Sequence, residues 1–443
     1  MARKDYDTVS DAEESKSRHR EETSRSNDPS PEVYAQGITR SMMDRDAVKV
    51  IRRLSSHGYR AFLVGGGVRD LLLGRKPKDF DVATSALPHD VRRLFRNCRV
   101  IGRRFRLAHV LFSGGKIIEV ATFRKDPDQR YEERGGDDDT PVRLVPIRRD
   151  SADEADLLIR NDNVFGHPHE DAIRRDFTIN GLFYDLERQE VIDYVGGMDD
   201  LDQRVLRTIG DPDVRFREDP IRILRAIKFS ARLDFGLDPD LYDAITEIRG
   251  ELSRAARPRL LEELLRLLRG GAAQRSIFLC QDTGVLAMIM PELAGFLDDD
   301  PTRAELTYRR LEAIDRMQRR DSLPTDAVLV SALLLGPIYE WIEGERDVAG
   351  AFHDFMVEVA ERLAMPRRLR DRMRIIISCQ RRLRLGRLGS LPRREFFGDA
   401  ATLFRIECEA QGEDIPDWAL GSLSETEAPA PRRQRRRRRR RRN

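Results

Sequence analysis

The sequence predicts an α+β protein in which a small mixed sheet with flanking helices is followed by an all-α region. Short apolar runs typical of buried strands alternate with helical patterns up to about Tyr184, and amphipathic helical patterns dominate beyond it. The chain has 443 residues, too many for one ordinary hydrophobic core. We therefore expect an α/β head followed by helical domains.

The elements of the head follow one another closely. Apolar residues recur at helical spacing in "DAVKVIRRLSSHGYR", and Gly58 is placed to end that helix. "AFLVGGG" predicts a buried strand entering a glycine turn, "VRDLLLG" a short helix ended by Gly74, and "DFDVAT" a second strand. A helix from Pro88 to Phe95 and strands in "RVIG", "AHVLFSGG" and "KIIEVATFR" complete the head.

The rest of the chain contains one long polar stretch and many helices. Residues 126–163 have no sustained period, so this loop is either disordered or functional. In "PRLLEELLRLLRGG" a proline opens and a glycine closes an amphipathic helix. The predicted organisation is a disordered N-terminal segment (1–40), the head (41–185), a helical neck and body (186–290), a helical C-terminal domain (291–425) and a disordered arginine-rich tail (426–443).

Composition excludes several classes of protein. The longest nearly uncharged apolar run, 327–339, has about thirteen residues and contains Pro337, so we expect no membrane insertion. The polar start differs from a signal peptide. The four cysteines are scattered without a CxxC pair, which gives no indication of a zinc site or a disulfide framework. A cytoplasmic enzyme or binding protein fits these features.

The formal net charge of +3 hides an uneven distribution. Ten arginines lie between Arg432 and Arg442, and without them the net charge is −7. A basic arm of this kind binds nucleic acid by releasing counterions from the phosphate backbone. We expect the tail to contact RNA or DNA; the alternative is a solvated, disordered tail.

Two aspartates in "DFDVAT" are the first candidates for chemistry. Side chains alternate along a strand, so Asp79 and Asp81 point to one side while Phe80 is buried behind them. Paired carboxylates suit Mg²⁺, and two-metal sites use them to clamp an attacking and a leaving oxygen. Glu119, in a predicted strand, is a candidate third ligand. Alone, such a pair is more often a surface turn or part of a salt bridge.

The glycine turn favours a phosphate nearby. Gly65 and Gly66 lie between a strand and a helix start, where backbone N–H groups and the helix dipole attract anions, and Arg69 adds a guanidinium. The spacing matches neither the NTPase phosphate loop nor the dinucleotide fingerprint. A triple glycine by itself is often only a tight turn.

Two further clusters are charged. In "EDAIRRDFTING", Arg174, Arg175, Asp176 and Asn180 are interleaved with apolar residues, which suits either a triphosphate and metal or a salt-bridge network. In "REDPIRILRAIKFSARL", Asp219 has the form of a helix N-cap before Pro220. One face of that helix is apolar and the other is basic; the apolar residues are Ile223, Leu224, Ile227 and Ala231, and the basic residues are Arg222, Arg225, Lys228 and Arg232.

The basic face is either a solvated surface or a reader of a nucleobase. In the second interpretation Asp219 accepts from an exocyclic amino group and Arg222 donates to the neighbouring ring nitrogen. Adenine and cytosine present that pattern, whereas guanine and uracil present the opposite one. An unmatched buried donor or acceptor costs about 1 to 3 kcal/mol, so the pair selects A and C together.

These motifs occur in an order that resembles a known family. GGGVRDLLLG, DFD, RRDFTIN and EDPIRILRA, across residues 45–290, are similar to the class II nucleotidyltransferases, which comprise poly(A) polymerases and CCA-adding tRNA nucleotidyltransferases. The resemblance implies a polymerase-β-like nucleotidyltransferase head and two catalytic Mg²⁺ ions. It implies that Asp79 and Asp81 bind the metals, that Gly66, Arg69 and Arg175 hold the triphosphate, that Asp176 is catalytic, and that Asp219, Arg222 and Arg225 recognise the base. Lys228 stands where the family usually has arginine, which keeps the charge but loses the bidentate geometry.

The poly(A) polymerase branch is the closer resemblance. "VIGRRFRLAHV" (Val100 to Val110), "IRNDNVFGHPHEDAIRRDFTING" and the arginine-rich C-terminus are typical of that branch. It implies transfer of AMP from ATP to RNA 3′ ends with release of pyrophosphate, giving tails that promote RNA decay; any RNA-decay protein partners stay unknown. The alternatives are CCA addition to tRNA and a non-catalytic RNA-binding scaffold. A metal phosphohydrolase, suggested by "FHDF" around His353 and Asp354, lacks partner ligands.

Overall fold

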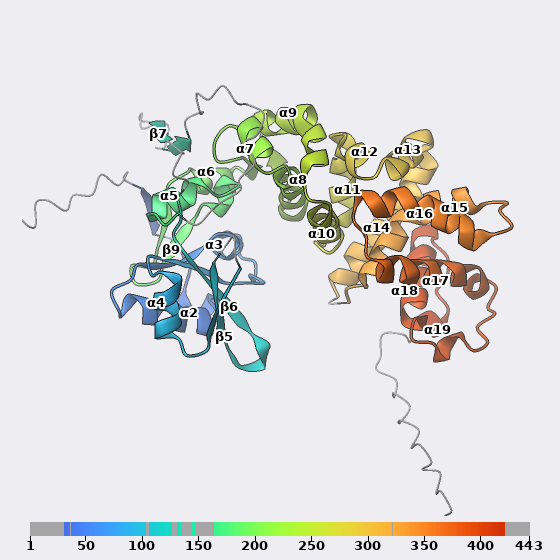
Figure 1. Ribbon diagram of the computed structural model, residues 1–443, viewed down its shortest axis with the longest axis horizontal. Coiled ribbons are helices and arrows are strands. Elements are labelled where there is room, and N and C mark those ends of the chain that lie inside the picture. The colour runs from blue at the N-terminus through green and yellow to red at the C-terminus, as the bar shows by residue number, and fades with distance from the viewer. Residues whose placement is uncertain are drawn as a thin grey trace, which may run out of the picture. The chain divides into compact units, whose positions relative to one another are not determined.

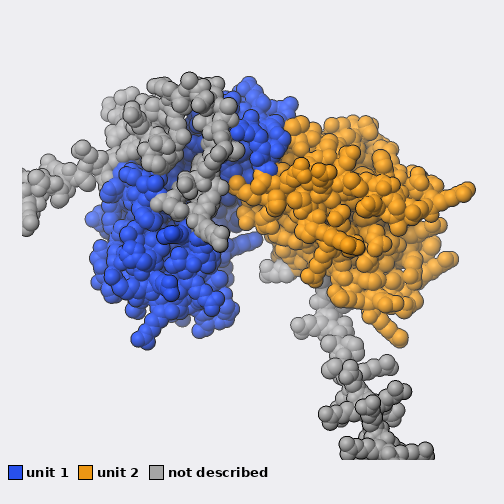
Figure 2. Space-filling view, in the orientation of Figure 1, with its two compact units in different colours: residues 1–255 blue, residues 256–443 orange. Residues whose placement is uncertain are grey.

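The computed structural model describes residues 31–35, 37–102, 106–125, 131–134, 143–146, 164–320 and 322–420 (Figure 1). These residues form two compact units, divided between Ala255 and Ala256 (Figure 2). Unit 1 holds the sheet and the helices around it, and unit 2 is built from helices. The α+β fold class is therefore confirmed.

An eight-stranded mixed sheet forms the centre of unit 1. Its order is β1-β10-β9-β2-β3-β6-β5-β4, and only β3 and β6 run parallel among its pairs. The parallel pair lies mid-sheet, next to the strand that precedes the glycine turn. The strands are β1 Glu32–Ala35, β2 Ala61–Val64, β3 Asp81–Thr84, β4 Cys98–Ile101, β5 Leu107–Leu111, β6 Ile117–Thr122, β9 Phe183–Asp185 and β10 Glu190–Asp193.

The two faces of the sheet carry separate hydrophobic cores. On one face Leu63, Val82 and Val120 pack with α2 (Arg45–Ser55) and α4 (Pro88–Leu94). The other face presents a second buried cluster that includes Phe62 and Ala83 and residues of α5 (Pro168–Ile173). Side chains of successive strand residues alternate between these cores. Asp81 lies on the same face as Ala83, which brings its carboxylate to the side of α5.

Short helices and strands complete unit 1. Among them, α8 carries Arg222 and Arg225 of the predicted base-reading residues, Asp219 lies between α7 and α8, and β11 pairs parallel with β12 beside α8. The bounds are α3 Gly66–Leu72, α6 Gly197–Asp202, α7 Pro212–Glu218, α8 Ile221–Leu233, α9 Pro239–Ile248, β11 Val205–Leu206 and β12 Gly236–Leu237, with 3-10 turns at Arg40–Met42, Ser113–Gly115, Thr178–Asn180 and Arg249–Arg254.

Unit 2 consists of packed helices with one short 3-10 turn, Leu391–Arg393, in its described part. The helix α15 is apolar on nearly every side and is buried along most of its length, with α14, α16, α17 and α18 around it. The bounds are α10 Arg257–Leu268, α11 Ala273–Asp282, α12 Val285–Ile289, α13 Pro291–Asp299, α14 Pro301–Gln318, α15 Asp326–Ile342, α16 Val348–Arg362, α17 Arg367–Arg384, α18 Phe397–Gln411 and α19 Asp417–Leu420. Along the described residues, no helix combines the length and the apolar character needed to cross a bilayer.

Three sequence predictions need correction. β3 begins at Asp81, not Asp79, because pairing with β2 stops at Val64, where the glycine turn starts. Residues 32–35, predicted to be disordered, form the edge strand β1 on β10, a pairing distant in sequence that local composition does not reveal. The 126–163 loop contains an antiparallel pair, β7 (Tyr131–Arg134) and β8 (Arg143–Pro146), whose strands are too short and polar to give a period.

Several predicted segments lie outside the described residues. These are most of the N-terminal segment (1–30 and 36), the arginines 103–105 of "VIGRRFRLAHV", the remainder of the 126–163 loop and the tail beyond residue 420. The predicted domain limits stay predictions. The division at residue 255 falls within the predicted neck and body.

Candidate active site

The end of β2, the glycine turn and the start of β3 meet at one place. Asp81 is the register partner of Val64, directly before Gly65. Asp79 and Asp81 are exposed while Phe80 is partly buried against the core, so their exposure alternates as the sequence predicts. A methyl group added to Gly67 would lie 3.4 Å from the backbone oxygen of Asp79, which shows how closely the turn and the aspartates approach.

The carboxylates influence one another electrostatically. Desolvation, the charge of Glu119 and that of Asp79 raise the pKa of Asp81 to about 6, while Arg175 acts in the opposite direction. Glu119 is adjacent because β3 pairs with β6 in parallel, and its Oε1 is 3.2 Å from Nε2 of His109. A cation between the aspartates would relieve their repulsion. Within the described ranges, however, no three acidic, histidine or cysteine side chains form a ready metal site.

The glycine turn has a conformation that requires glycine. Gly65 has φ +68° and ψ −133°, and its N–H donates to the carbonyl of Leu182. A Cβ there would come within 2.9 Å of Nη1 of Arg175. The turn therefore makes room for a guanidinium from a segment more than a hundred residues away, and the Gly65 amide is not available to a phosphate.

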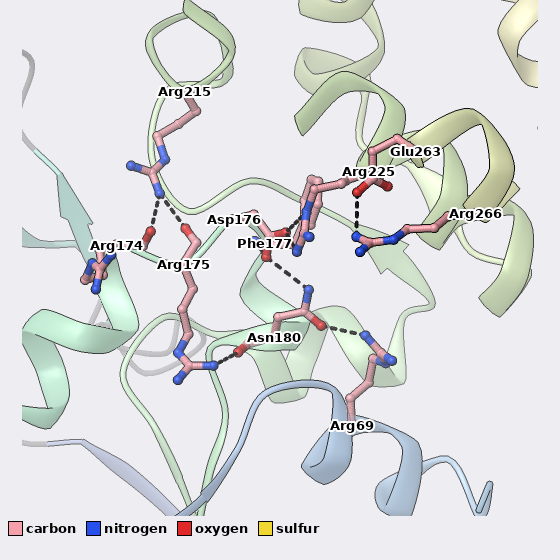
Figure 3. Close-up of polar contacts among 10 residues, drawn as sticks. All are labelled: Arg69, Arg174, Arg175, Asp176, Phe177, Asn180, Arg215, Arg225, Glu263 and Arg266. Atoms are coloured by element: carbon pink, nitrogen blue, oxygen red, sulfur yellow. Dashed lines mark hydrogen bonds and ion pairs between the residues drawn. The ribbon is translucent and has the colours of Figure 1, made fainter. Parts of the chain in front are cut away.

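Arg175 lies between the turn and α5. Its Nη1 donates to the carbonyl of Asn180 at 3.2 Å (Figure 3). Its Nη2 donates to Asp171 Oδ2 at 2.9 Å, and its guanidinium lies 5.2 Å from the Phe183 ring centroid. The side chain keeps 22% exposure. Arg175 thus has a fixed orientation, a solvent-accessible part and an electrostatic effect on Asp81, which together suit an anion-binding side chain.

Asp176 occupies the centre of a buried polar network. Its Oδ1 accepts from Asn180 Nδ2 at 3.0 Å and its Oδ2 accepts from Arg225 Nε at 2.8 Å (Figure 3). Burial alone would raise the pKa of Asp176, but Arg225, Asn180 and Arg222 outweigh it and hold that pKa well below its ordinary range. The carboxylate is therefore ionised and joined to α8.

Arg69 is placed differently from the sequence interpretation. It is 2% exposed, donates to Asp70 and to Asn180 Oδ1 at 2.6 Å, and lies over the Phe229 ring. Burial lowers the pKa of Arg69, and the neighbouring Asp70 opposes that effect. In this structure Arg69 connects α3 with the Asp176 network and α8, so its guanidinium is committed to protein partners.

The predicted base-reading face of α8 is only partly exposed. The sequence predicts Asp219 as the N-cap, but Pro220 occupies that position and Asp219 directly precedes it. The Oδ1 of Asp219 accepts from the Ile221 N–H at 3.3 Å. Arg222 is 8% exposed and its Nη1 donates to Glu218 and to the carbonyl of Arg215. The buried Arg222 differs from the fully basic exposed face that the sequence predicts, because Glu218 on α7 pairs with it.

Three members of the predicted basic set keep partial exposure, namely Arg225, Lys228 and Arg232. Lys228 Nζ lies 5.0 Å from the Phe229 ring centroid, and Arg225 reaches Asp176. Arg232 donates to Asp70. Arg222 is therefore the one member of this set that is buried.

Sequence reasoning missed Arg215 and the acidic partners of the arginines. Arg215 is buried and donates to the carbonyls of Arg174 and Arg175 (Figure 3). It also pairs with Glu218 at 2.8 Å. Burial, then the charge of Arg222, lowers the pKa of Arg215 to about 10. The spacing of Arg215, Glu218 and Arg222 at three and four residues was the available signal.

Comparison with known proteins matches two families. Residues 61–207 match the family described as "Poly A polymerase head domain". Residues 234–297 match "Probable RNA and SrmB-binding site of polymerase A". The first match spans the glycine turn, both aspartates and Asp176.

Relatives from two groups share long stretches of the sequence. Poly(A) polymerase I of Salmonella typhimurium is 39% identical over 362 residues, covering 78% of this chain and 74% of the relative. The CCA-adding enzyme of Geobacillus stearothermophilus is 38% identical over 252 residues, covering 57% and 55%. The crystal structure of the Bacillus stearothermophilus CCA-adding enzyme in complex with CTP has a TM-score of 0.62 and 26% identity, covering 86% of this chain and 82% of that one.

Proposed function

The chain belongs to the nucleotidyltransferase family that contains poly(A) polymerase I and the CCA-adding enzymes, and we propose that it extends RNA 3′ ends with AMP taken from ATP. In this reaction the 3′ hydroxyl of the RNA attacks the α-phosphate of ATP. A phosphodiester bond forms, and pyrophosphate leaves. The protein is a template-independent polynucleotide adenylyltransferase.

The observation that carries this choice is the extent of the similarity. Identity to poly(A) polymerase I continues over 78% of the chain, whereas identity to the CCA-adding enzyme, nearly equal per residue, stops at 57%. Polyadenylation is therefore favoured over CCA addition.

The triphosphate is proposed to lie against the glycine turn. Arg175, oriented by Asp171 and Asn180, would donate to phosphate oxygens, and the Gly66 amide at the start of α3 faces the same turn. Arg69 stabilises this arrangement indirectly, because it donates to the side chain of Asn180, whose carbonyl accepts from Arg175. Fixed donors of this kind stabilise the charge that develops during phosphoryl transfer.

The exposed carboxylates fit divalent cations. Asp79 and Asp81 are hard oxygen donors, and desolvation together with the charges of Glu119 and Asp79 raises the pKa of Asp81. A bound cation would offset the repulsion among these carboxylates. We propose that they hold two Mg²⁺ ions, with Glu119 as a weaker third ligand beside His109. Bound Mg²⁺ would activate the attacking hydroxyl and neutralise the leaving pyrophosphate.

Base selection is proposed to rest on α8. Asp219 offers an acceptor at the start of the helix, and Arg225 and Lys228 line the exposed side next to it. Arg222, held by Glu218, has one fixed orientation, which suits a donor that must match one pattern of ring atoms. An Asp219 and Arg222 pair would admit A and C; separating these two bases requires further contacts.

RNA is the proposed macromolecular partner. Residues 234–297 match a probable RNA-binding family, and the arginine-rich tail, outside the described residues, would attract the phosphate backbone. We further propose a cytoplasmic location and tails that promote RNA decay.

Offering one nucleotide at a time tests this function. The purified full chain, Mg²⁺ and a generic RNA should give long tails with ATP alone and little product with CTP, GTP or UTP. With a tRNA that lacks its 3′ end, a product that stops after C, C and A would instead establish CCA addition. Failure to incorporate any nucleotide, with RNA binding intact, would indicate a non-catalytic scaffold.

A further inference from the structure

Unit 2 contains a cavity far along the chain from the residues discussed above. It has a volume of about 810 Å³ and lies among α15, α16, α17 and α18, which pack against one another. Its volume falls within the range of small-molecule and nucleotide sites. Its apolar lining consists chiefly of Tyr339, Ile342, Val348, Phe352, Ile377 and Phe404.

The lining contains both buried and partly exposed aromatic residues. Phe352 and Phe404 are each 5% exposed. Tyr339 is 37% exposed, so part of this lining residue is accessible to solvent. An exposed aromatic ring beside an apolar floor is the kind of surface on which a nucleobase stacks.

One helix supplies the charge at this cavity. Arg374, Ser378 and Arg381 recur at four and three residues along α17, so they share the face that lines the cavity. Arg374 and Arg381 are exposed, and in the described part of the chain neither side chain has a hydrogen bond or ion pair. They are about 10 Å apart along the helix axis, so the two side chains can contact two different phosphates of one strand.

The other charged residues of the lining are largely committed. Glu407 is buried and paired with Arg310, which donates from both Nε and Nη2. Arg384 pairs with Glu413 at 2.8 Å. Glu345 at the rim is the remaining carboxylate of the lining. The available charge is therefore positive, and it lies beside an apolar recess.

We propose that this cavity binds one nucleotide of the single-stranded RNA substrate, upstream of the 3′ end. The base occupies the apolar recess near Tyr339, and neighbouring phosphates pair with Arg374 and Arg381. RNA is favoured over an acidic peptide because every nucleotide places a planar apolar group next to a phosphate, the alternation that this cavity offers. The proposal rests on the proposed function, since it takes RNA to be the substrate.

Equilibrium RNA binding by the full chain, measured without ATP or Mg²⁺, tests the proposal. Fluorescence anisotropy with a labelled single-stranded RNA is recorded over a range of salt concentrations. The double variant R374A/R381A should bind RNA about tenfold more weakly. Its slope of log affinity against log salt should be shallower by about 1.4, the value for two lost phosphate contacts. A349W fills the cavity and leaves the charge unchanged. It should bind RNA about tenfold more weakly, with the same slope of log affinity against log salt as wild type.

A charge-matched control separates this site from general attraction. Arg382 and Arg387 are exposed, belong to the same helix or the turn after it, and do not line the cavity, so R382A/R387A should bind within about twofold of wild type. Equal weakening in the control, or wild-type binding by A349W, would overturn the proposal. Thermal melting of each variant identifies any that fail to fold.

Two further readouts complete the test. RNA carrying 4-thiouridine should crosslink to residues lining the cavity, and crosslinks confined to residues 1–255 would contradict the proposal. If polyglutamate competes for binding as well as RNA of equal charge does, the ligand of this cavity would be an acidic peptide and not RNA. Because no nucleotide is added, these results do not depend on incorporation; a wild-type protein that binds RNA here but adds no AMP would refute only the proposed function.

Discussion

At the residue scale, the candidate site depends on how each charged side chain is compensated. Asp176 is buried and ionised because Arg225 and Asn180 supply donors to both of its oxygens. Asp81 is in the opposite situation, since desolvation and the carboxylates of Glu119 and Asp79 raise its pKa. The first arrangement stabilises the fold, and the second would suit the proposed cation.

Replacing Asp176 tests the stabilising role. D176N should lower the free energy of unfolding at pH 7 by about 3 kcal/mol, because it leaves Arg225 without its carboxylate. The folded-state pKa of Asp176 is depressed, so its contribution is fully present above the unfolded value and is lost as pH falls below about 4. Urea unfolding should show the difference between wild type and D176N shrinking by about 1.4 kcal/mol per pH unit below that point. A difference independent of pH would contradict the ionised assignment.

Replacing Asp81 tests the proposed metal role. D81A should reduce AMP incorporation by about a thousandfold, while RNA affinity stays within about twofold of wild type. E119A is the matched comparison, and we expect a smaller loss because the Glu119 carboxylate is already beside His109. Primer extension with labelled ATP measures both. Equal losses of AMP incorporation in D81A and E119A would indicate that Glu119 is a full metal ligand.

At the element scale, the structure joins α3 to α8. Asp70, 4% exposed, accepts from Arg69 and from Arg232 Nη2 at 3.3 Å. Arg75 donates to the carbonyls of residues 232 and 233, at the end of α8. The helix after the glycine turn is therefore held against the helix proposed to read the base, which fixes the relative position of triphosphate and base contacts.

Removing Asp70 should destabilise this pair of helices. D70A leaves two guanidiniums without their shared carboxylate, one of them buried, and should cost about 3 kcal/mol in unfolding free energy. R75A removes an exposed side chain of the same connection and should cost less than about 1 kcal/mol. Chemical denaturation of both variants measures the difference, and a loss for D70A no larger than that for R75A would argue against the connection.

Substitutions at two glycines distinguish the effect of backbone strain from the effect of a changed site geometry. G65A places a Cβ within 2.9 Å of Arg175 Nη1 at a positive φ, so it should lose both about 1 to 3 kcal/mol of stability and most of its incorporation activity. G74A also adds a Cβ at positive φ but meets no atom within 4 Å. G74A should therefore lose stability but keep its incorporation activity. Comparable activity in the two variants would show that the turn does not position Arg175.

At the scale of the whole molecule, charge is distributed unevenly between the described chain and its tail. The ten arginines between residues 432 and 442 turn a net charge of −7 into +3. Long-range attraction of RNA would therefore come largely from the tail. Specific contacts would belong to the folded units.

Neutralising the tail tests this division. Changing the ten arginines to glutamine keeps the length of the tail. If every arginine contacts a phosphate, the slope of log affinity against log salt should become shallower by up to about 7. Affinity at physiological salt should fall, while turnover with saturating RNA should stay within about twofold. An unchanged slope would show that the tail does not contact RNA. Anisotropy and primer extension provide the two measurements.

The sequence by itself determined the fold class, the strand, turn and helix around Gly65, and the alternation of Asp79 and Asp81 about Phe80. These features follow from local preferences, since glycine at positive φ, apolar runs and strand periodicity each act over a few residues. The family resemblance rested on the same short motifs.

Only the tertiary structure decided how far each arginine is exposed. Arg69 and Arg222 have the same local signature as Arg175 and Arg225, yet the first pair is buried against Asp70 and Glu218 while the second keeps solvent exposure. Arg69 is paired with the next residue, Asp70, and with Asn180 more than a hundred residues away, and Arg222 is paired with Glu218 on the preceding helix. The burial of a side chain depends on packing between elements, and sequence spacing alone does not show which arginines become buried.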